Sequence, residues 1–317
     1  MATPYVTPDI IANAPTGVPW NIIPFPKATS EQQLAEQTNI CWRATGRVDS
    51  FCNQPLRATL DTEDTYGPDY RLTIGQDGVA RALVSRVPIV SVPAVRCSAR
   101  SSFPRQWQVL PAGAAQPESP PLGVYNTTTF GSAGDINNAI LIQPGYIGWG
   151  GGRNGYIVEL TYLNGWPHAG LLTAPIAGAT SFRVDDVTAW TGAAGFIYDG
   201  ANTEQIKVAS VVADNPVTVP GGVSIPVGPG TVTLATATTQ PHPVGVVMSS
   251  IPPIIQWATI MYCAALVLES GASAVTIQSL PGSRTSGGPG IEAIIKDIEG
   301  DPATHKQGIL QPFCRVI

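Results

Sequence analysis

Glycine and proline recur along the whole chain, and they limit what it can fold into. The 317 residues include 33 glycines and 30 prolines, roughly a fifth of the chain against a usual share of about 12%. Both residues interrupt helices and occupy turns. Their frequency predicts many short elements joined by turns and long loops, and it argues against a compact all-helical fold.

The chain is also poor in charge. Charged residues make up 12% of it and hydrophobic residues 44%, and the net charge is −5, whereas a typical domain has about 25% charged residues. Such surfaces are common in subunits of large assemblies, because much of the surface becomes interface. The net negative charge argues against an electrostatic nucleic-acid binder, whose surface carries a basic patch.

No segment is typical of export or membrane insertion. The first 20 residues lack a basic region and are broken by prolines, so we expect no signal peptide. The longest apolar run, residues 254–269, contains Gln256 and ends at Glu269. We therefore expect no membrane span, and a protein that is cytoplasmic or part of an assembly.

Three segments carry helical patterns. The first has Ser30 as its expected N-cap and Gln33 as its capping-box partner, and Pro55 ends it. Residues 253–269 predict a nearly all-apolar helix, which must be buried on every side, in a core or between subunits. Residues 291–300 predict a short amphipathic helix. The expected buried face of the first helix contains Leu34, Cys41, Val48 and Cys52.

Other segments carry strand patterns. Residues 56–98 contain alternating and β-branched runs separated by turn dipeptides, which predicts a small antiparallel sheet. Residues 99–131 form a long loop, and alternation returns in "YIVELTYL", residues 156–163. Residues 171–248 have almost no helical signal and predict five or six short strands, as in a small barrel or sandwich.

These patterns together predict an α+β fold. Its small helical core combines the N-terminal helix, the buried helix near 253–269 and the short C-terminal helix. The expected parts are an N-terminal helix with an antiparallel β region, an inserted all-β barrel or sandwich module, a helical part that completes the core, and an extended C-terminal tail, at residues 1–170, 171–248, 249–300 and 301–317.

No catalytic or cofactor signature occurs in the sequence. GxSxG, HExxH, EF-hand and nucleotide-binding motifs are absent, and the glycine-rich "GWGGGRNG" lacks the Lys-Ser/Thr end of a P-loop. Five cysteines without a CxxC pair and three histidines argue against a disulfide scaffold or a zinc site. We expect buried free thiols, no enzyme activity, no cofactor and no metal.

Two acidic clusters raise the question of a site. Asp199, Asn202 and Glu204 lie within six positions in "FIYDGANTEQIKVASV". They are candidate calcium ligands or the paired carboxylates of a hydrolase. However, Asp199-Gly200 is a common turn dipeptide, so the sequence favours a β-hairpin turn. The second cluster, in "LDTEDTYGPDY", comprises Asp61, Glu63, Asp64 and Asp69.

The order of several segments along the chain is similar to that in a known family of proteins. The segments are "LAEQTNICWRATGRVDSFCNQPLRATLDTEDTYGPDYRLTI", then "SRVPIVSVPAVRCS", and later "IIQWATIMYCAALVLESGASAVTIQSLPGS". This order resembles the head–tail adaptor (connector, or head-completion) proteins of tailed bacteriophages. The segment "LLTAPIAGATSFRVDDVTAW" and the hairpin after it are similar to small β-modules of phage structural proteins. The long loop and the inserted β-module depart from the smaller adaptors.

The resemblance implies a structural virion protein at the head–tail interface, assembled in the host cytoplasm. It would form a homo-oligomeric ring, a dodecamer, around a channel through which DNA passes with transient, non-specific contact. Its partners would be the portal protein and tail or neck proteins. The expected portal-binding residues are Ile309, Leu310, Phe313, Val316 and Ile317, and the expected ring-packing residues are Ile255, Trp257, Met261, Tyr262 and Leu268.

The C-terminal tail, residues 301–317, has no evident intramolecular role in the sequence, and a partner could order it. An alternative function is a β-rich binding module of a phage tail or baseplate, which recognises carbohydrate or a capsid or tail protein. Trp149, Trp166 and Trp190 are the candidate aromatics for carbohydrate, although each also suits a core or hairpin position.

Overall fold

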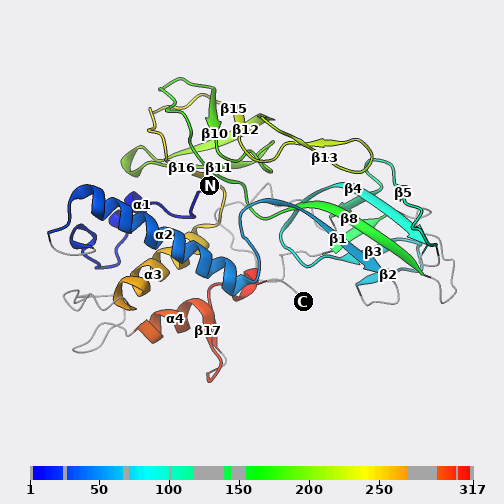
Figure 1. Ribbon diagram of the computed structural model, residues 1–317, viewed down its shortest axis with the longest axis horizontal. Coiled ribbons are helices and arrows are strands. Elements are labelled where there is room, and N and C mark those ends of the chain that lie inside the picture. The colour runs from blue at the N-terminus through cyan, green and yellow to red at the C-terminus, as the bar shows by residue number, and fades with distance from the viewer. Residues whose placement is uncertain are drawn as a thin grey trace.

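The computed structural model describes residues 3–23, 27–66, 71–99, 102–117, 139–143, 155–269, 291–304 and 306–314. It has an α+β fold, as the sequence predicts. Figure 1 shows a group of helices on one side, a β-sandwich on the other, and a second β unit above them. We call this second unit, strands β9 to β16, the β-module.

The helices come from both ends of the chain and form one body. They are α1 (Pro8–Asn13), α2 (Ser30–Cys52), α3 (Pro253–Glu269) and α4 (Ile291–Glu299). α3 packs against both α2 and α4. Short 3-10 helices accompany them and the β-module, at η1 (Trp20–Ile22), η3 (Gly200–Asn202) and η4 (Gln311–Phe313).

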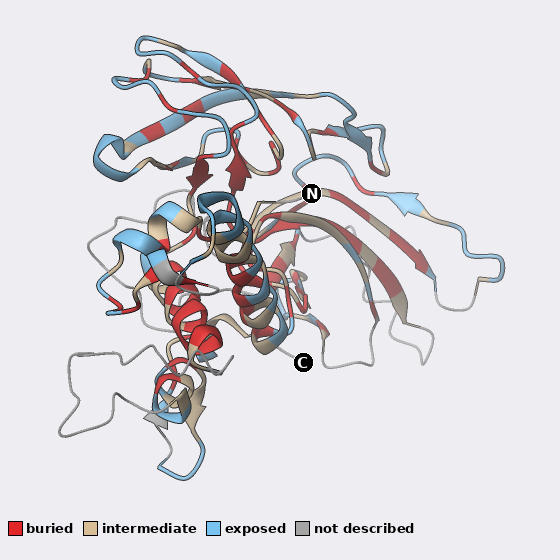
Figure 2. Ribbon diagram, turned by 60° about the vertical axis from the view of Figure 1, so that its left-hand side comes forward, coloured by how far each residue is buried: buried red, intermediate tan, exposed pale blue. Residues whose placement is uncertain are grey.

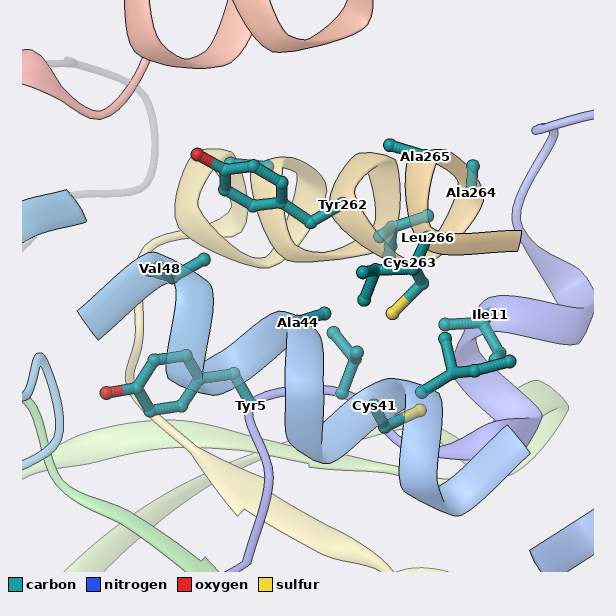
Figure 3. Close-up of a cluster of buried hydrophobic side chains, with 14 of the residues drawn as sticks. Tyr5, Ile11, Cys41, Ala44, Val48, Tyr262, Cys263, Ala264, Ala265 and Leu266 are labelled. Atoms are coloured by element: carbon teal, nitrogen blue, oxygen red, sulfur yellow. The ribbon is translucent and has the colours of Figure 1, made fainter. Parts of the chain in front are cut away.

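α3 confirms the prediction of a helix that is buried on every side. Ile255, Tyr262 and Cys263 are each 0% exposed, and Figure 2 shows buried residues along most of the helix. In Figure 3, the apolar side chains of α3 face those of α2, with Cys263 pointing toward Cys41. Burying each large apolar side chain stabilises the fold by about 1.5–3 kcal/mol, so α3 contributes strongly to the stability of the helical body.

The ends of α2 differ slightly from the prediction. Thr29 is the N-cap, and its capping box is formed with Gln32, one residue earlier than predicted. The Thr29 hydroxyl accepts from the Gln32 N–H at 3.3 Å, and the Gln32 side chain accepts from the Thr29 N–H at 3.0 Å. Asn53, in the left-handed conformation at φ 53°, ends the helix before Pro55 is reached, because asparagine tolerates this conformation.

The buried face of α2 is shorter than predicted. Cys41, Val48 and Cys52 are 0% exposed, as expected, but Leu34 is 56% exposed. The buried positions of α2 begin at Ile40. The first turns of α2 therefore extend beyond the core, and the prediction for Leu34 is wrong.

The β-sandwich consists of two antiparallel four-stranded sheets. One has the order β1-β8-β4-β5 and the other the order β2-β3-β7-β6. Their facing side chains form one apolar cluster, in which Tyr162 and Leu160 are 0% exposed. The strands are β1 (Thr59–Tyr66), β8 (Tyr156–Asn164), β4 (Ile89–Ala99), β5 (Gln108–Val109), β2 (Leu72–Ile74), β3 (Ala80–Leu83), β7 (Ala139–Ile142) and β6 (Ala115–Pro117).

The β-module is a six-stranded antiparallel sheet of order β10-β15-β12-β11-β16-β9. A bridge between Leu171 and Val184 joins its two edges, so the sheet curls back on itself around a core that includes Trp190. The strands are β9 (His168–Gly170), β10 (Ser181–Val184), β11 (Ala194–Tyr198), β12 (Glu204–Ala213), β15 (Gly230–Leu234) and β16 (Val247–Ser249), with the hairpin β13 (Val217–Thr218) and β14 (Ser224–Ile225).

The N-terminal strap, residues 3–6, connects the β-module to the helices. On the module side, the Thr3 hydroxyl donates to Asp185 Oδ2 at 2.7 Å, and His168 Nε2 lies 3.0 Å from the Pro4 carbonyl oxygen. On the helix side, the Tyr5 hydroxyl donates to Asp49 Oδ1 of α2 at 2.5 Å. Three residues of extended chain therefore bind two parts of the molecule at once.

The C-terminal segment packs against the helical body. β17 (Gly300–Asp301) and β18 (Lys306–Gln307) form a short hairpin. After it, Leu310 is 0% exposed, and Ile309 and Phe313 pack against the same core. The expectation that the tail has no intramolecular role is therefore wrong for residues 306–314. Val316 and Ile317 lie outside the described residues.

The burial of His168 predicts a pH-dependent stability. Its burial lowers its pKa from 6.5 to about 4. The pairing with a carbonyl oxygen assigns the proton to Nε2, so Nδ1 accepts from the Ser249 hydroxyl at 2.9 Å. The folded state keeps the His168 ring neutral. On acidification, His168 is therefore protonated first in the unfolded chain, which favours unfolding. The free energy of unfolding should fall by about 3 kcal/mol as the pH decreases from 6.5 to 4.

Urea unfolding at several pH values measures this effect. The His168→Asn variant provides the control, because it keeps a polar side chain and removes the titration. A wild-type chain whose stability changes with pH between 6.5 and 4 no more than that of the variant would contradict the assignment.

Candidate functional site

A cleft of about 780 Å³ lies between the β-sandwich and the β-module. One wall is the outer face of β1, β8 and β4, and the other is the β13–β14 hairpin with the turn that follows β10. Its size is within the usual range for a ligand site. The described lining residues are Arg57, Ala58, Thr59, Leu60, Thr62, Arg96, Glu159, Thr161, Asp186, Thr188, Val217, Thr218, Val219, Pro220 and Val227.

The charged groups of the cleft are held by other groups of the chain. Arg96 contacts Glu159 through two atoms, Nε to Oε1 at 2.6 Å and Nη2 to Oε2 at 2.7 Å. The Arg96 guanidinium also lies over the Trp107 ring, 4.5 Å from its centre. The hydrogen bond that Arg96 donates to Glu159 raises the pKa of Arg96. This arrangement fits a structural ion pair that stiffens the sheet.

The carboxylate of Asp186, on the β-module side of the cleft, also has its hydrogen-bond partners within the chain. Asp186 Oδ1 accepts from the Thr188 N–H at 2.9 Å, the Thr188 hydroxyl at 2.5 Å and the Gly228 N–H at 3.2 Å. It therefore holds the turn after β10. The described lining of the cleft contains neither histidine nor cysteine, and the hydroxyls of Thr59, Thr62, Thr161 and Thr188 are themselves hydrogen-bonded within the chain.

The acidic cluster of β1 also has structural partners. Glu63 accepts from the Tyr162 hydroxyl and from Arg71, whose Nη2 lies 2.6 Å from Glu63 Oε2. Burial alone would raise the pKa of Glu63, but hydrogen bonds from Ser85, Tyr162 and Arg71 lower it. Asp61 contacts Arg86 and Asn164, and Asp64 contacts Arg105; Asp69 lies outside the described residues. Their contacts favour a structural network over a hydrolase pair.

Asp199 and Glu204 lie at the two ends of a β-hairpin connection, as the sequence predicts. β11 and β12 are antiparallel, with Ile197 opposite Glu204, and η3 connects them. Their partner was not predicted. The buried ring of His242 lies between the two carboxylates, with Nδ1 3.0 Å from Asp199 Oδ2 and Nε2 2.7 Å from Glu204 Oε1.

This cluster fastens the segment that precedes β16 to the hairpin. Glu204 also accepts from the Thr239 N–H at 2.8 Å and the Thr239 hydroxyl at 2.6 Å. Burial would raise the pKa of Glu204, but the hydrogen bonds from Thr239 and His242 lower it. Both ring contacts of His242 can be hydrogen bonds only when both nitrogens carry protons. The proline on each side of His242, at Pro241 and Pro243, was the only sequence signal for a fixed loop here.

The described residues offer no metal centre and no spanning helix. No group of three or more His, Cys, Asp or Glu side chains in the described ranges could hold a metal ion. Within the same ranges, no helix is long and apolar enough to cross a membrane.

The residues predicted to pack in a ring or to bind carbohydrate differ in how far they are buried. Of the expected ring-packing residues, Ile255 and Tyr262 are fully buried within this chain, whereas Trp257, Met261 and Leu268 are partly buried against the same core. Of the expected carbohydrate-binding aromatics, Trp166 and Trp190 are 3% and 0% exposed, so neither is a surface platform. Trp149 lies outside the described residues.

We predict that His242→Ala destabilises the β-module. Removing the ring leaves Asp199 and Glu204 without their shared donor, which should lower the free energy of unfolding by about 2–3 kcal/mol. The shift in the urea midpoint measures this loss. The matched control is Asp214→Ala, which breaks the exposed Arg183–Asp214 pair at 2.5 Å and should cost less than about 1 kcal/mol. Equal losses in the two variants would refute a structural role for the cluster.

Comparison of the chain with protein-family models, with curated proteins and with solved structures found no match.

Proposed function

We propose that the chain is a non-enzymatic structural subunit of a bacteriophage virion. Copies of it would form a closed ring, a head–tail adaptor, between the portal protein and the tail or neck proteins, around a channel for DNA. The low charge of the chain and the order of its segments support this proposal. The observation that carries it is the exposed face of α2.

The exposed face of α2 carries few charges after its first turn, which contains the exposed Glu31. From Ala35 onward, the exposed residues at helical spacing are small or polar, with Arg43 as the one charged residue among them. A helix face in contact with water normally carries several charges, whereas depletion of charge is typical of the core of a protein interface. The α2 face, as we call it, consists of Ala35, Asn39, Arg43, Gly46 and Ser50.

Gly46 is the most informative residue of the α2 face. A glycine inside a helix destabilises it by roughly 0.5–1 kcal/mol relative to alanine. A Cβ built at Gly46 would meet no atom within 4 Å, so the packing of the chain does not require glycine here. Close approach of a neighbouring helix would require it. The α2 face therefore fits a contact between copies, which in a ring is head-to-tail.

The C-terminal segment is the proposed portal contact. Leu310 anchors it in the core, whereas Ile309 and Phe313 are only partly buried. Phe313 lies beside the C-terminal end of α2, where the Gln54 side chain donates to the Phe313 carbonyl at 2.7 Å. Ile309, Phe313 and the last residues, Val316 and Ile317, would then contact the portal, while Leu310 holds the segment in place.

Substitutions at Gly46 test the ring contact. Gly46→Gln should prevent ring formation, because the longer side chain keeps the neighbouring helix away, while the isolated subunit becomes slightly more stable. Negative-stain imaging of the subunit mixed with portal, together with sedimentation, measures assembly. Ala293→Gln, at an exposed position of α4, adds the same bulk elsewhere and should assemble normally. Rings formed by Gly46→Gln as readily as by the wild type would exclude the α2 face.

The cleft favours a second candidate function, the binding of a segment of a capsid or tail protein. It is lined by hydroxyls and valines, and its described lining contains no aromatic residue on which a sugar could stack. Thr62→Arg, at an exposed position in the cleft, should weaken binding of tail proteins in a pull-down without affecting ring formation. Unchanged binding would exclude the cleft.

A further inference from the structure

The described cysteines include two pairs of neighbouring thiols. In the first pair, Cys41 of α2 and Cys263 of α3 are both 0% exposed, and their thiols share a hydrogen bond. In the second pair, Cys52 at the end of α2 is hydrogen-bonded to the thiol of Cys314, just after η4. All are free thiols, and Cys97 is buried without a cysteine partner of this kind among the described residues.

Contacts with the backbone fix the positions of the two sulfur atoms of the second pair, Cys52 and Cys314. The Leu310 carbonyl oxygen lies 4.0 Å from Cys52 Sγ and 3.6 Å from Cys314 Sγ. Cys314 Sγ also lies 3.7 Å from the carbonyl oxygen of Phe51, the residue before Cys52. The two sulfurs therefore occupy one small site, although 262 positions separate them in sequence.

The two pairs differ in access. Cys41 and Cys263 lie inside the helical body, where Figure 3 shows them among apolar side chains. Cys314 is only partly buried, whereas Cys52 is fully buried. Cys314 is therefore the more accessible thiol of its pair, and we infer that a small reagent reacts first with Cys314 and that Cys52 reacts only through it.

We propose that Cys52 and Cys314 are a disulfide-forming pair that reacts with small-molecule disulfides and locks the C-terminal segment to α2. The Cys314 thiolate attacks one sulfur of the reagent and releases one thiolate. Cys52 then gives up its proton and attacks Cys314 Sγ, which releases the second thiolate. Two protein thiols are oxidised, and one reagent disulfide is reduced to two thiols.

The electrostatic environment supports this order of attack. The hydrogen bond from Cys52 lowers the pKa of Cys314, although its partial burial acts in the opposite direction. The hydrogen bond with Cys314 and burial both raise the pKa of Cys52. Because the thiolate is the nucleophile in thiol–disulfide exchange, Cys314 is the thiol that reacts first.

The chemistry of the pair does not depend on the proposed function, but its consequence does. If the chain is an adaptor, it is made in a reducing cytoplasm and then released with the virion into oxidising surroundings. The disulfide would then form after assembly and fix the segment that carries the proposed portal contact. Mapping the disulfide tests the pair by itself, because it needs neither portal nor ring.

The test uses the native, full-length chain incubated with oxidised glutathione, then alkylated and digested without reductant for mass spectrometry. We expect a Cys52–Cys314 cross-linked peptide as the main product, with Cys41, Cys97 and Cys263 alkylated as free thiols. The cross-linked chain should also unfold a few degrees higher than the reduced chain, and a reductant should reverse this shift.

Two variants separate the steps. Cys52→Ser should accumulate one glutathione on Cys314, because no second thiol displaces it, and Cys314→Ser should leave Cys52 unmodified. Far-UV and near-UV circular dichroism confirm that both variants are folded. A wild-type chain in which glutathione stays on Cys314, in which no thiol reacts, or in which Cys41 and Cys263 cross-link first would overturn the proposal.

Discussion

The burial of α3 is the constraint on which the rest of this structure depends. Its sequence has no polar face, so every side of it must be covered. α2 covers one side and α4 another, and the C-terminal segment inserts Leu310 into the same core. Because these elements come from both ends of the chain, the helical body cannot form until residues 30–52 and 253–310 meet. The β units are therefore inserted into a helical protein.

Polar contacts determine how the inserted parts are held against the helices. The N-terminal strap binds the β-module through Thr3 and Pro4, and α2 through Tyr5. The Tyr5 hydroxyl also accepts from the N–H groups of Leu56 and Arg57, where the chain leaves α2 for the β-sandwich. Burial and the neighbouring Asp49 raise the pKa of Tyr5, so it remains a neutral donor. This node connects all three parts of the molecule.

Local pattern predicted much of the fold, because helices and strands are encoded by short-range periodicity. The long apolar run of α3, the amphipathic α4 and the alternation in β8 were all correctly assigned. Strand β1 lies within the range predicted as a sheet, but the partners of its acidic residues Asp61, Glu63 and Asp64 could not be read from the local pattern. Their charges are matched by Arg86, Arg71 and Arg105, which come from other segments.

The candidate site was less predictable, because it depends on contacts over long sequence distances. The hairpin at Asp199 was assigned correctly, but His242 is 43 residues away from Asp199, and no local pattern connects the two. The cleft and the Cys52–Cys314 pair arise only when separate parts of the chain pack together. The role of the C-terminal segment was misjudged for the same reason, since Leu310 packs into a core that α2, α3 and α4 build together.

The central claim of this account is that copies of the chain assemble through the α2 face. Electron cryomicroscopy of the wild-type chain bound to portal tests it most directly. The account predicts a closed ring in which Gly46 of each copy lies against a helix of the next, with the C-terminal segments directed to the portal. A chain that stays monomeric beside the portal, or a ring in which the α2 face is exposed to solvent, would contradict it.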